Sequence, residues 1–146
     1  VLENARSFNP QARIDGMTIQ SMAAPGTELV LGLHRDAAFG PVVMVGLGGI
    51  FIEVFKDVVF GVPPIDHAAA LAMIGRIRAQ AMLDGARGRA SVDREALAKA
   101  LCALSRVVSQ HPDIAELDLN PVFANADGIV AVDWLMMKGT DDAEGE

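Results

Sequence analysis

The sequence predicts an α+β fold: a mostly antiparallel sheet packed against helices. Three observations carry this prediction. Residues 27–47 show strand-like alternation and then a continuous apolar run, residues 65–109 show helical spacing, and two apolar segments near the end flank Asp127-Gly128. Strands, helices and strands therefore follow one another in blocks, whereas a parallel α/β sheet would alternate them.

Composition narrows the class of protein. The chain has 146 residues, of which 51% are hydrophobic, so it can form a packed domain. Its net charge of −7 argues against partners such as nucleic acid or an anionic membrane. No apolar run approaches the roughly 20 residues of a membrane span. Cys102 is the single cysteine and cannot form an internal disulfide, so we expect a reducing, cytoplasmic location.

The two ends of the chain differ from its middle. Residues 1–13 are largely polar and read as a linker or the end of a preceding segment, and Val1 does not look like a natural start. Residues 139–146, GTDDAEGE, read as a disordered acidic tail. We therefore expect one domain over residues 14–138, as a piece of a larger protein.

The first half of this domain is expected to be extended. Residues 13–22 and 27–36 flank the turn signal Pro25-Gly26, which predicts a hairpin that brings Gln20 close to Glu28. Residues 41–47, PVVMVGL, read as a strand buried on both faces. Residues 50–64 read as further extended chain that ends at two prolines.

Two helices are predicted next. The first follows Asp66 as N-cap and has apolar residues every fourth position, namely Ile65, Ala69, Met73 and Ile77. The second begins after Ser91 or Asp93 and runs to about Ser109. Its apolar stripe consists of Leu97, Leu101, Leu104 and Val108. Cys102 lies beside this stripe, where small-residue packing is the expected role.

The last two strands, about 114–123 and 129–135, carry polar residues at informative positions. Because side chains alternate along a strand, Glu116, Asp118 and Asn120 should share one face. Asn120 and Asp133 would lie on neighbouring strands, where their oxygens could bind a hard cation such as Mg²⁺. The alternative is that Asp118 pairs with an arginine and Asn120 begins a turn before Pro121. Spacing alone leaves both open.

The glycine-rich segment after residue 45 also has two interpretations. Gly46 and Gly48 begin a dinucleotide-loop spacing, but Phe51 stands in the third glycine's place and no helical pattern follows. The segment is either a strand end where close backbone approach excludes side chains, or a glycine-lined face beside a substrate, with Glu53 nearby.

Taken together, these stretches resemble a known family. Residues 16–57, the DGARGRASVD segment and residues 114–133 are similar, in the same order, to the ATP-grasp domain of NDP-forming acyl-CoA synthetases, relatives of succinyl-CoA synthetase β subunits. The resemblance implies the second, C-terminal ATP-grasp subdomain. It also implies ATP or ADP and Mg²⁺ as cofactors, and phosphoryl transfer between ADP and an acyl phosphate or phosphohistidine.

The resemblance also implies roles for individual residues. Gln20, with Ser21 and Met22, would bind adenine, and Glu28 would bind the ribose hydroxyls. Mg²⁺ would be held by a set formed by Asn120, Asp133 and, as an additional candidate, Asp118. The face turned toward the phosphoryl-transfer partner would include Gly46, Gly48, Gly49 and Glu53.

Further partners follow from the same resemblance. The family's first subdomain supplies a lysine and a phosphate loop, and other domains hold the phosphohistidine, CoA and the acyl substrate. We expect those domains as partners, with a homodimer possible. Gly61 stands where the family is expected to carry arginine, which keeps an alternative open: a ligand-sensing, synthetase-like region of a protein lysine acetyltransferase.

Overall fold

The computed structural model describes residues 1–49, 56–86 and 90–139. The strands are β1 (Thr27–Asp36), β2 (Gly40–Leu47), β3 (Val58–Gly61), β4 (Ile114–Asn125), β5 (Gly128–Ala131) and β6 (Trp134–Lys138). The helices are α1 (Leu2–Phe8), α3 (His67–Gly75), α4 (Gln80–Leu83) and α5 (Arg94–Gln110). No helix within these described residues is long and apolar enough to cross a membrane.

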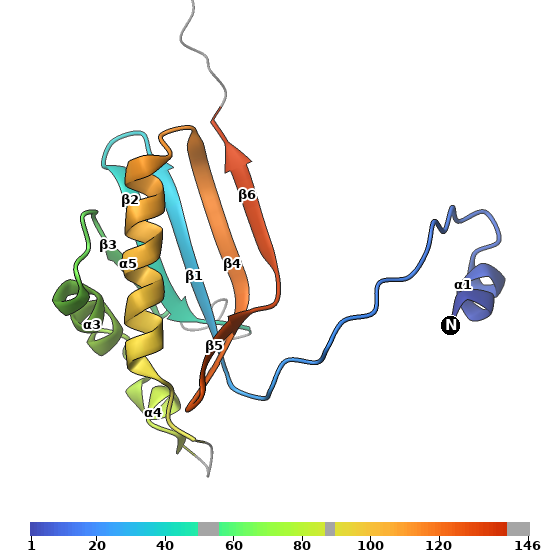
Figure 1. Cartoon of the computed structure of the whole chain (residues 1–146), viewed down its shortest axis with the longest axis horizontal. Helices are drawn as coiled ribbons and strands as arrows, with labels where there is room; N and C mark the ends of the chain where they lie inside the picture. The colour runs from blue at the N-terminus through green and yellow to red at the C-terminus, as the bar shows by residue number, and fades with distance from the viewer. Residues whose placement is uncertain (50–55, 87–89, 140–146) are drawn as a thin grey trace, which may run out of the picture.

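The strands form one antiparallel sheet in the order β3-β2-β1-β4-β5, and β6 pairs with β4 beside β5. Helices α3 and α5 lie against one face of this sheet, as Figure 1 shows. We call the opposite face the open face. The predicted α+β class and the mostly antiparallel sheet are confirmed.

The hydrophobic core lies between the sheet and these helices. Alternate residues of β1 and β2, such as Leu31 and Val45, point into it and are fully buried. On α5, Leu97, Leu101, Leu104 and Val108 are buried, which confirms the predicted stripe. Removing such surface from water is the main term that stabilises the fold.

The two predicted helices begin where their caps indicate. Asp66 accepts a hydrogen bond from the Ala69 N–H at 2.8 Å, and Asp93 accepts one from the Ala96 N–H at 2.9 Å. The predicted apolar spacing of the first helix is partly wrong, because Ala69 is exposed and the helix buries Ala70, Met73 and Ile74 instead.

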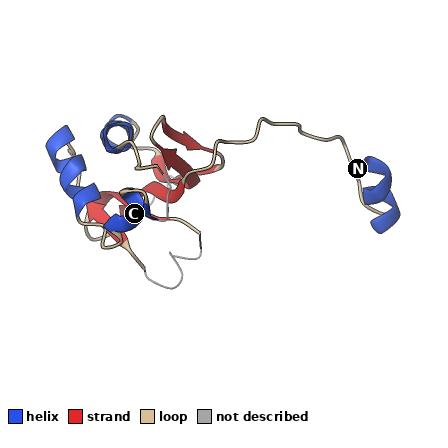
Figure 2. Ribbon diagram, turned by 90° about the horizontal axis from the view of Figure 1, so that it is seen from below, coloured by secondary structure: helices blue, strands red, loops and turns tan. Residues whose placement is uncertain are grey.

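The predicted hairpin between residues 13–22 and 27–36 is wrong. Residues 13–22 form no strand, and both sides of β1 are occupied by β2 and β4, so β1 has no edge left for them. Residues 9–26 instead run as an arm from the sheet to α1. Helix α1, which the sequence analysis does not predict, lies away from the sheet in both views (Figures 1 and 2).

The predicted turn at Asp127-Gly128 is present, since β4 and β5 pair around it. The strand expected over 129–135 is divided, however, into β5 and β6. Between them the Val132 N–H donates to the Pro121 carbonyl at 3.1 Å, and the Asp133 carbonyl accepts from the Asn120 N–H at 3.2 Å. The register against β4 is the same on both sides of this break, and Asp133 lies at the junction.

Asp57 anchors the chain just before β3. Its side chain is 5% exposed and accepts hydrogen bonds from the backbone N–H groups of Arg78 and Ala79, at 2.9 and 2.8 Å. Burial by itself raises the pKa of Asp57. These N–H groups and the Arg78 guanidinium outweigh burial and hold the pKa below its ordinary value.

We therefore expect Asp57→Ala to lower the free energy of unfolding by about 1–3 kcal/mol, because two partly buried backbone N–H groups lose their acceptor. Since the folded-state pKa is lowered, the stabilisation by Asp57 is present above the ordinary pKa of 3.8 and is lost as the pH falls below it. Urea unfolding at several pH values measures both effects. Asp15→Asn, at an exposed position of the arm, is the control; an equal loss of stability in both variants would contradict the assignment.

Candidate functional site: the open face of the sheet

The open face displays the side chains that alternate with the core residues of each strand. On β1 these are Glu28, Val30, Gly32 and His34, with Glu28 and His34 exposed at its two ends. On β4, Asp118 lies opposite Gly32 and Phe123 lies opposite Glu28. Because Gly32 is four residues after Glu28 on β1, Glu28 and Asp118 are separated by roughly 13 Å along the strand direction.

Two predicted metal ligands lie opposite each other at the level of an irregularity in β4. The pairing register between β1 and β4 shifts between Leu29 and Leu31, opposite Asn120 and Pro121. At this bulge Asn120 meets the β5–β6 junction, and its N–H donates to the Asp133 carbonyl at 3.2 Å. Asn120 and Asp133 are neighbours, as predicted, and both are exposed.

Asp118 lies two residues before Asn120 on β4. One of its carboxylate oxygens, Oδ1, is buried and has no hydrogen-bond partner within the described part of the chain. Burial raises the pKa of Asp118, and the nearby carboxylates of Glu116 and Asp133 raise it further. No arginine pairs with Asp118 among the described residues. The alternative prediction, in which Asp118 pairs with an arginine, is therefore wrong for the described residues.

These donors fit a magnesium ion better than a soft metal. The site offers two carboxylates, Asp118 and Asp133, and the amide oxygen of Asn120. Across the described residues, no group of three or more His, Cys, Asp or Glu side chains is placed to hold a metal. Mg²⁺ takes one or two carboxylates and completes its shell with phosphate and water. An orphaned buried oxygen with a raised pKa is consistent with a cationic or hydrogen-bonding partner at this point.

The glycines after β2 pack against Glu28. The Gly48 N–H donates to the Glu28 carbonyl at 2.7 Å, and a Cβ on Gly48 would lie 3.0 Å from that backbone. Gly49 has φ of +61°, and a Cβ there would lie 2.8 Å from Glu28 Oε2. Close approach therefore accounts for these glycines, and they also adjoin the open face beside Glu28. Glu53 lies outside the described residues.

The predicted adenine-binding residues are on the arm. Gln20, Ser21 and Met22 are exposed, and the structure does not bring Gln20 to Glu28 through a hairpin. The arm joins the sheet at Pro25, whose carbonyl accepts a hydrogen bond from Asn125 Nδ2 at 3.3 Å. Their role in binding a nucleobase stays a prediction.

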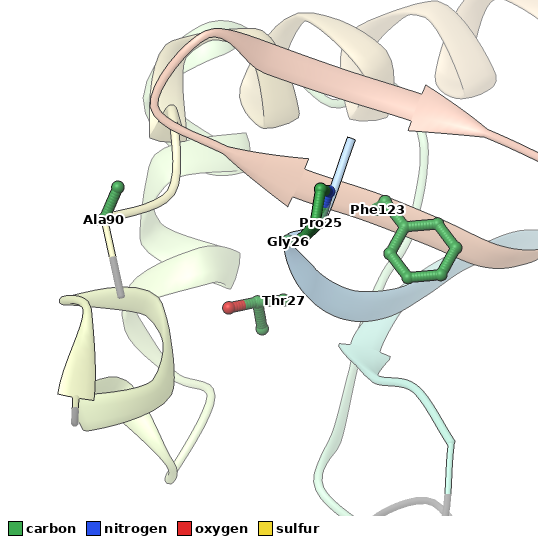
Figure 3. Close-up of a pocket in the computed structure, with 5 residues that line it drawn as sticks. All are labelled: Pro25, Gly26, Thr27, Ala90 and Phe123. Carbon is green, nitrogen blue, oxygen red and sulfur yellow. The ribbon is translucent and has the colours of Figure 1, made fainter. Parts of the chain in front are cut away.

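A cavity that sequence reasoning missed lies where the arm meets the sheet. It has a volume of about 360 Å³ and is lined by Pro25, Gly26, Thr27, Ala90 and Phe123. In Figure 3, Ala90 and Phe123 lie on opposite sides of Thr27. A Cβ on Gly26 would lie 2.5 Å from the Ala124 carbonyl oxygen, so only glycine permits this approach. Pro25-Gly26 is the sequence signal for this approach, although the pattern predicts a hairpin turn.

A smaller hollow of about 90 Å³ lies at the other end of the open face, between β1, β2, β3 and β4. It is lined on one side by the apolar residues Val42, Met44 and Phe60, and on the other by Glu116 and Asp118. The larger cavity thus lies at the end of the sheet where β1 begins, and the smaller hollow lies beside Asp118.

Gly61 does not face this site. A Cβ at residue 61 would point toward α3, 2.5 Å from Met73 Sδ and 3.1 Å from Ile65 Cδ1. A side chain there would begin in the core and not on the open face. An arginine at this position would therefore not supply positive charge to the open face, and glycine here removes none.

Comparisons with known proteins identify the family. The profile of the ATP-grasp domain family matches residues 1–137. Acetate–CoA ligase [ADP-forming] I subunit beta of Pyrococcus furiosus is 44% identical over 94% of this chain and 59% of its own length. Acetate–CoA ligase [ADP-forming] I of Archaeoglobus fulgidus is 39% identical over 97% of this chain and 21% of its own length.

Solved structures agree. The dinucleotide-forming acetyl-coenzyme A synthetase 1 of Candidatus Korarchaeum cryptofilum, in complex with coenzyme A and Ca-AMPCP, is 44% identical with a TM-score of 0.83. The match covers 94% of this chain and 60% of that one. Another structure of the same protein, with a TM-score of 0.76 and 46% identity, holds coenzyme A and Mg-AMPPCP; it covers 80% of this chain and 55% of that one.

The chain belongs to the ATP-grasp family, as the sequence resemblance predicted. It spans about three-fifths of the length of the Pyrococcus subunit and about a fifth of the Archaeoglobus protein.

Proposed function

We propose that this chain is the nucleotide- and Mg²⁺-binding part of the ATP-grasp domain of an NDP-forming acyl-CoA synthetase. Residues 14–138 would be its second subdomain. The complete enzyme would transfer a phosphoryl group between ADP and an acyl phosphate or phosphohistidine. The relatives named above are ADP-forming ligases, which favours this function over the regulatory region of an acetyltransferase. The inward direction of residue 61 removes the motivation for that alternative.

One observation carries the proposal: the polar groups of the open face follow one another in the order of the parts of a nucleotide. The cavity beside Phe123 comes first and Glu28 lies opposite Phe123. Asn120 and Asp133 come next, and Asp118 lies farther from the cavity than either. In this order a base would meet the cavity, the ribose would meet Glu28 and the phosphates would extend toward Asp118.

Each group suits the part that it would meet. The Glu28 carboxylate is an exposed acceptor for two vicinal hydroxyl groups. Asn120, Asp133 and Asp118 would hold Mg²⁺, which supplies positive charge to neutralise the transferring phosphoryl group. Mg²⁺ would also stabilise the ionised form of Asp118, against the burial that raises its pKa. Gln20, Ser21 and Met22 would close over the base from the arm.

The partners of the chain are part of the proposal. CoA and the acyl group would bind on the remaining domains or subunits of the synthetase, together with the first ATP-grasp subdomain and the phosphohistidine. A cytoplasmic location fits the single cysteine. The test of the activity is ATP formation from ADP, phosphate and acetyl-CoA by the complete synthetase, with and without Mg²⁺. Absence of ATP formation across a panel of acyl-CoA substrates would overturn the proposal.

The ribose assignment predicts a specific change in nucleotide selectivity. Wild-type enzyme should prefer ADP over 2′-deoxy- or 3′-deoxy-ADP by about 10- to 100-fold in kcat/KM, because a hydrogen bond to a charged group contributes about 1.5–3 kcal/mol. In Glu28→Ala this preference should fall to near unity while activity with the deoxy nucleotide changes little. Glu116→Gln, at the other end of the open face, is the control and should keep the preference. A preference unchanged in Glu28→Ala would remove the assignment.

A further inference from the structure

Strand β6 forms an apolar edge of the sheet. All five of its residues are exposed, and Trp134, Leu135, Met136 and Met137 are 63%, 55%, 43% and 47% exposed. We call residues 134–138 the β6 edge. No described strand pairs with its outer side. An exposed apolar edge strand is a template for pairing with another strand unless something protects it.

The backbone of β6 offers hydrogen-bonding groups on that outer side. The Asp133 carbonyl and the Gly139 N–H both point inward, since they bond to Asn120 and Asp113. Successive residues of a strand point their backbone groups to opposite sides. Trp134, Met136 and Lys138 therefore direct their N–H and C=O groups outward. The Trp134 N–H is already taken by Asp133 Oδ1 at 2.8 Å, whereas Met136 and Lys138 lie free of this contact.

We propose that the β6 edge pairs antiparallel with the β6 edge of a second copy of this chain, about a two-fold axis at Met136. The two Met136 residues then face each other and exchange both of their outward N–H···O=C bonds. The Lys138 N–H of each copy bonds to the Trp134 carbonyl of the other. The two sheets become one continuous sheet across the dimer. This inference is independent of the nucleotide site.

A second copy fits this edge because the strand is complementary to itself. The axis at Met136 sets Lys138 opposite Trp134 and Leu135 opposite Met137. Opposite residues share a face, so each lysine meets an indole ring and each leucine a methionine. Asp113 holds Lys138 Nζ at 2.9 Å within its own chain, which fixes the lysine stem beside the strand. No like charges face each other in this register.

Charge predicts how such a dimer responds to salt. Each copy carries a net charge of −7, so the two copies repel while the strand contact itself is apolar and hydrogen-bonded. Salt screens the repulsion, so the dimer should tighten as ionic strength rises. A contact built on ion pairs would weaken instead.

The test is sedimentation equilibrium of the 146-residue protein over a wide concentration range, with amide hydrogen exchange on the same samples. We expect the mass to rise with concentration from 15.4 kDa toward twice that value. Met136→Pro removes an outward N–H and spares the pairing with β4, so it should raise the dissociation constant about tenfold or more. In the wild type, the Met136 and Lys138 amides should become protected as the dimer forms.

Three further variants keep the result interpretable. Met136→Lys retains the N–H but places two like charges at the axis, and should also dissociate the dimer. Met136→Val retains the pairing and should change the dissociation constant by less than about threefold. Phe39→Ser, at another exposed aromatic residue, should have no effect. A monomer at every concentration, a dimer insensitive to both Met136→Pro and Met136→Lys, or a dimer with unprotected amides at residues 136 and 138 would each overturn the proposal.

Discussion

In the complete synthetase that we propose, Asp133→Ala and Asn120→Ala should each reduce Mg²⁺-dependent turnover by more than about a hundredfold. Even outer-shell partners of metal ligands cost 10–100-fold when mutated. The reason is geometric. The hairpin register of β4 with β5 and β6 sets these residues opposite each other, and a backbone hydrogen bond of 3.2 Å joins them. Under the proposed metal assignment, removing either oxygen would leave Mg²⁺ with fewer protein ligands and the phosphates with less neutralising charge.

The folding of these variants should be nearly unchanged, because both side chains are exposed. Thermal unfolding therefore separates a loss of metal binding from a loss of structure. Asp127→Ala, an exposed carboxylate in the turn of the same hairpin, is the matched control and should keep normal turnover. The discriminating measurement is the Mg²⁺ concentration dependence of kcat. Near-normal turnover in both ligand variants at low Mg²⁺ would remove the metal assignment.

Sequence reasoning succeeded where local patterns decide the structure. The caps Asp66 and Asp93, the stripe of α5 and the turn at Asp127-Gly128 all depend on residues close together in the chain. The neighbouring positions of Asn120 and Asp133 were also predictable, because a hairpin turn fixes which residues oppose each other.

Sequence reasoning failed where contacts between distant segments of the chain determine the structure. Pro25-Gly26 looks like a hairpin turn, but β1 is an inner strand, and Gly26 is required by its approach to the Ala124 carbonyl. The cavity is lined by residues far apart in sequence, such as Ala90 and Phe123, so no local sequence pattern predicts it. The direction of residue 61 likewise depended on how β3 lies over α3.

The 146-residue polypeptide by itself should bind ATP weakly even with Mg²⁺ present. Within its described residues, the open face brings four carboxylates, Glu28, Glu116, Asp118 and Asp133, toward the region where we place the nucleotide. A triphosphate bound there would have Mg²⁺ as its main counter-charge. Lysine and backbone N–H donors supplied by a first subdomain would add charge-assisted hydrogen bonds, each worth about 1.5–3 kcal/mol.

Two such bonds amount to roughly 3–6 kcal/mol, so a longer version of the protein with the additional region of its relatives should bind ATP about a hundred- to ten-thousandfold more tightly. Isothermal titration calorimetry of both proteins with ATP and Mg²⁺ measures the difference directly. The complete enzyme carrying Glu28→Ala provides the reference for losing the proposed ribose contact alone. Because we assign the adenine and ribose contacts to this chain, adenosine affinity should differ much less between the two proteins than ATP affinity. Equal ATP affinities would show that the open face suffices for the phosphates, and that its carboxylates are not the obstacle inferred from their charge.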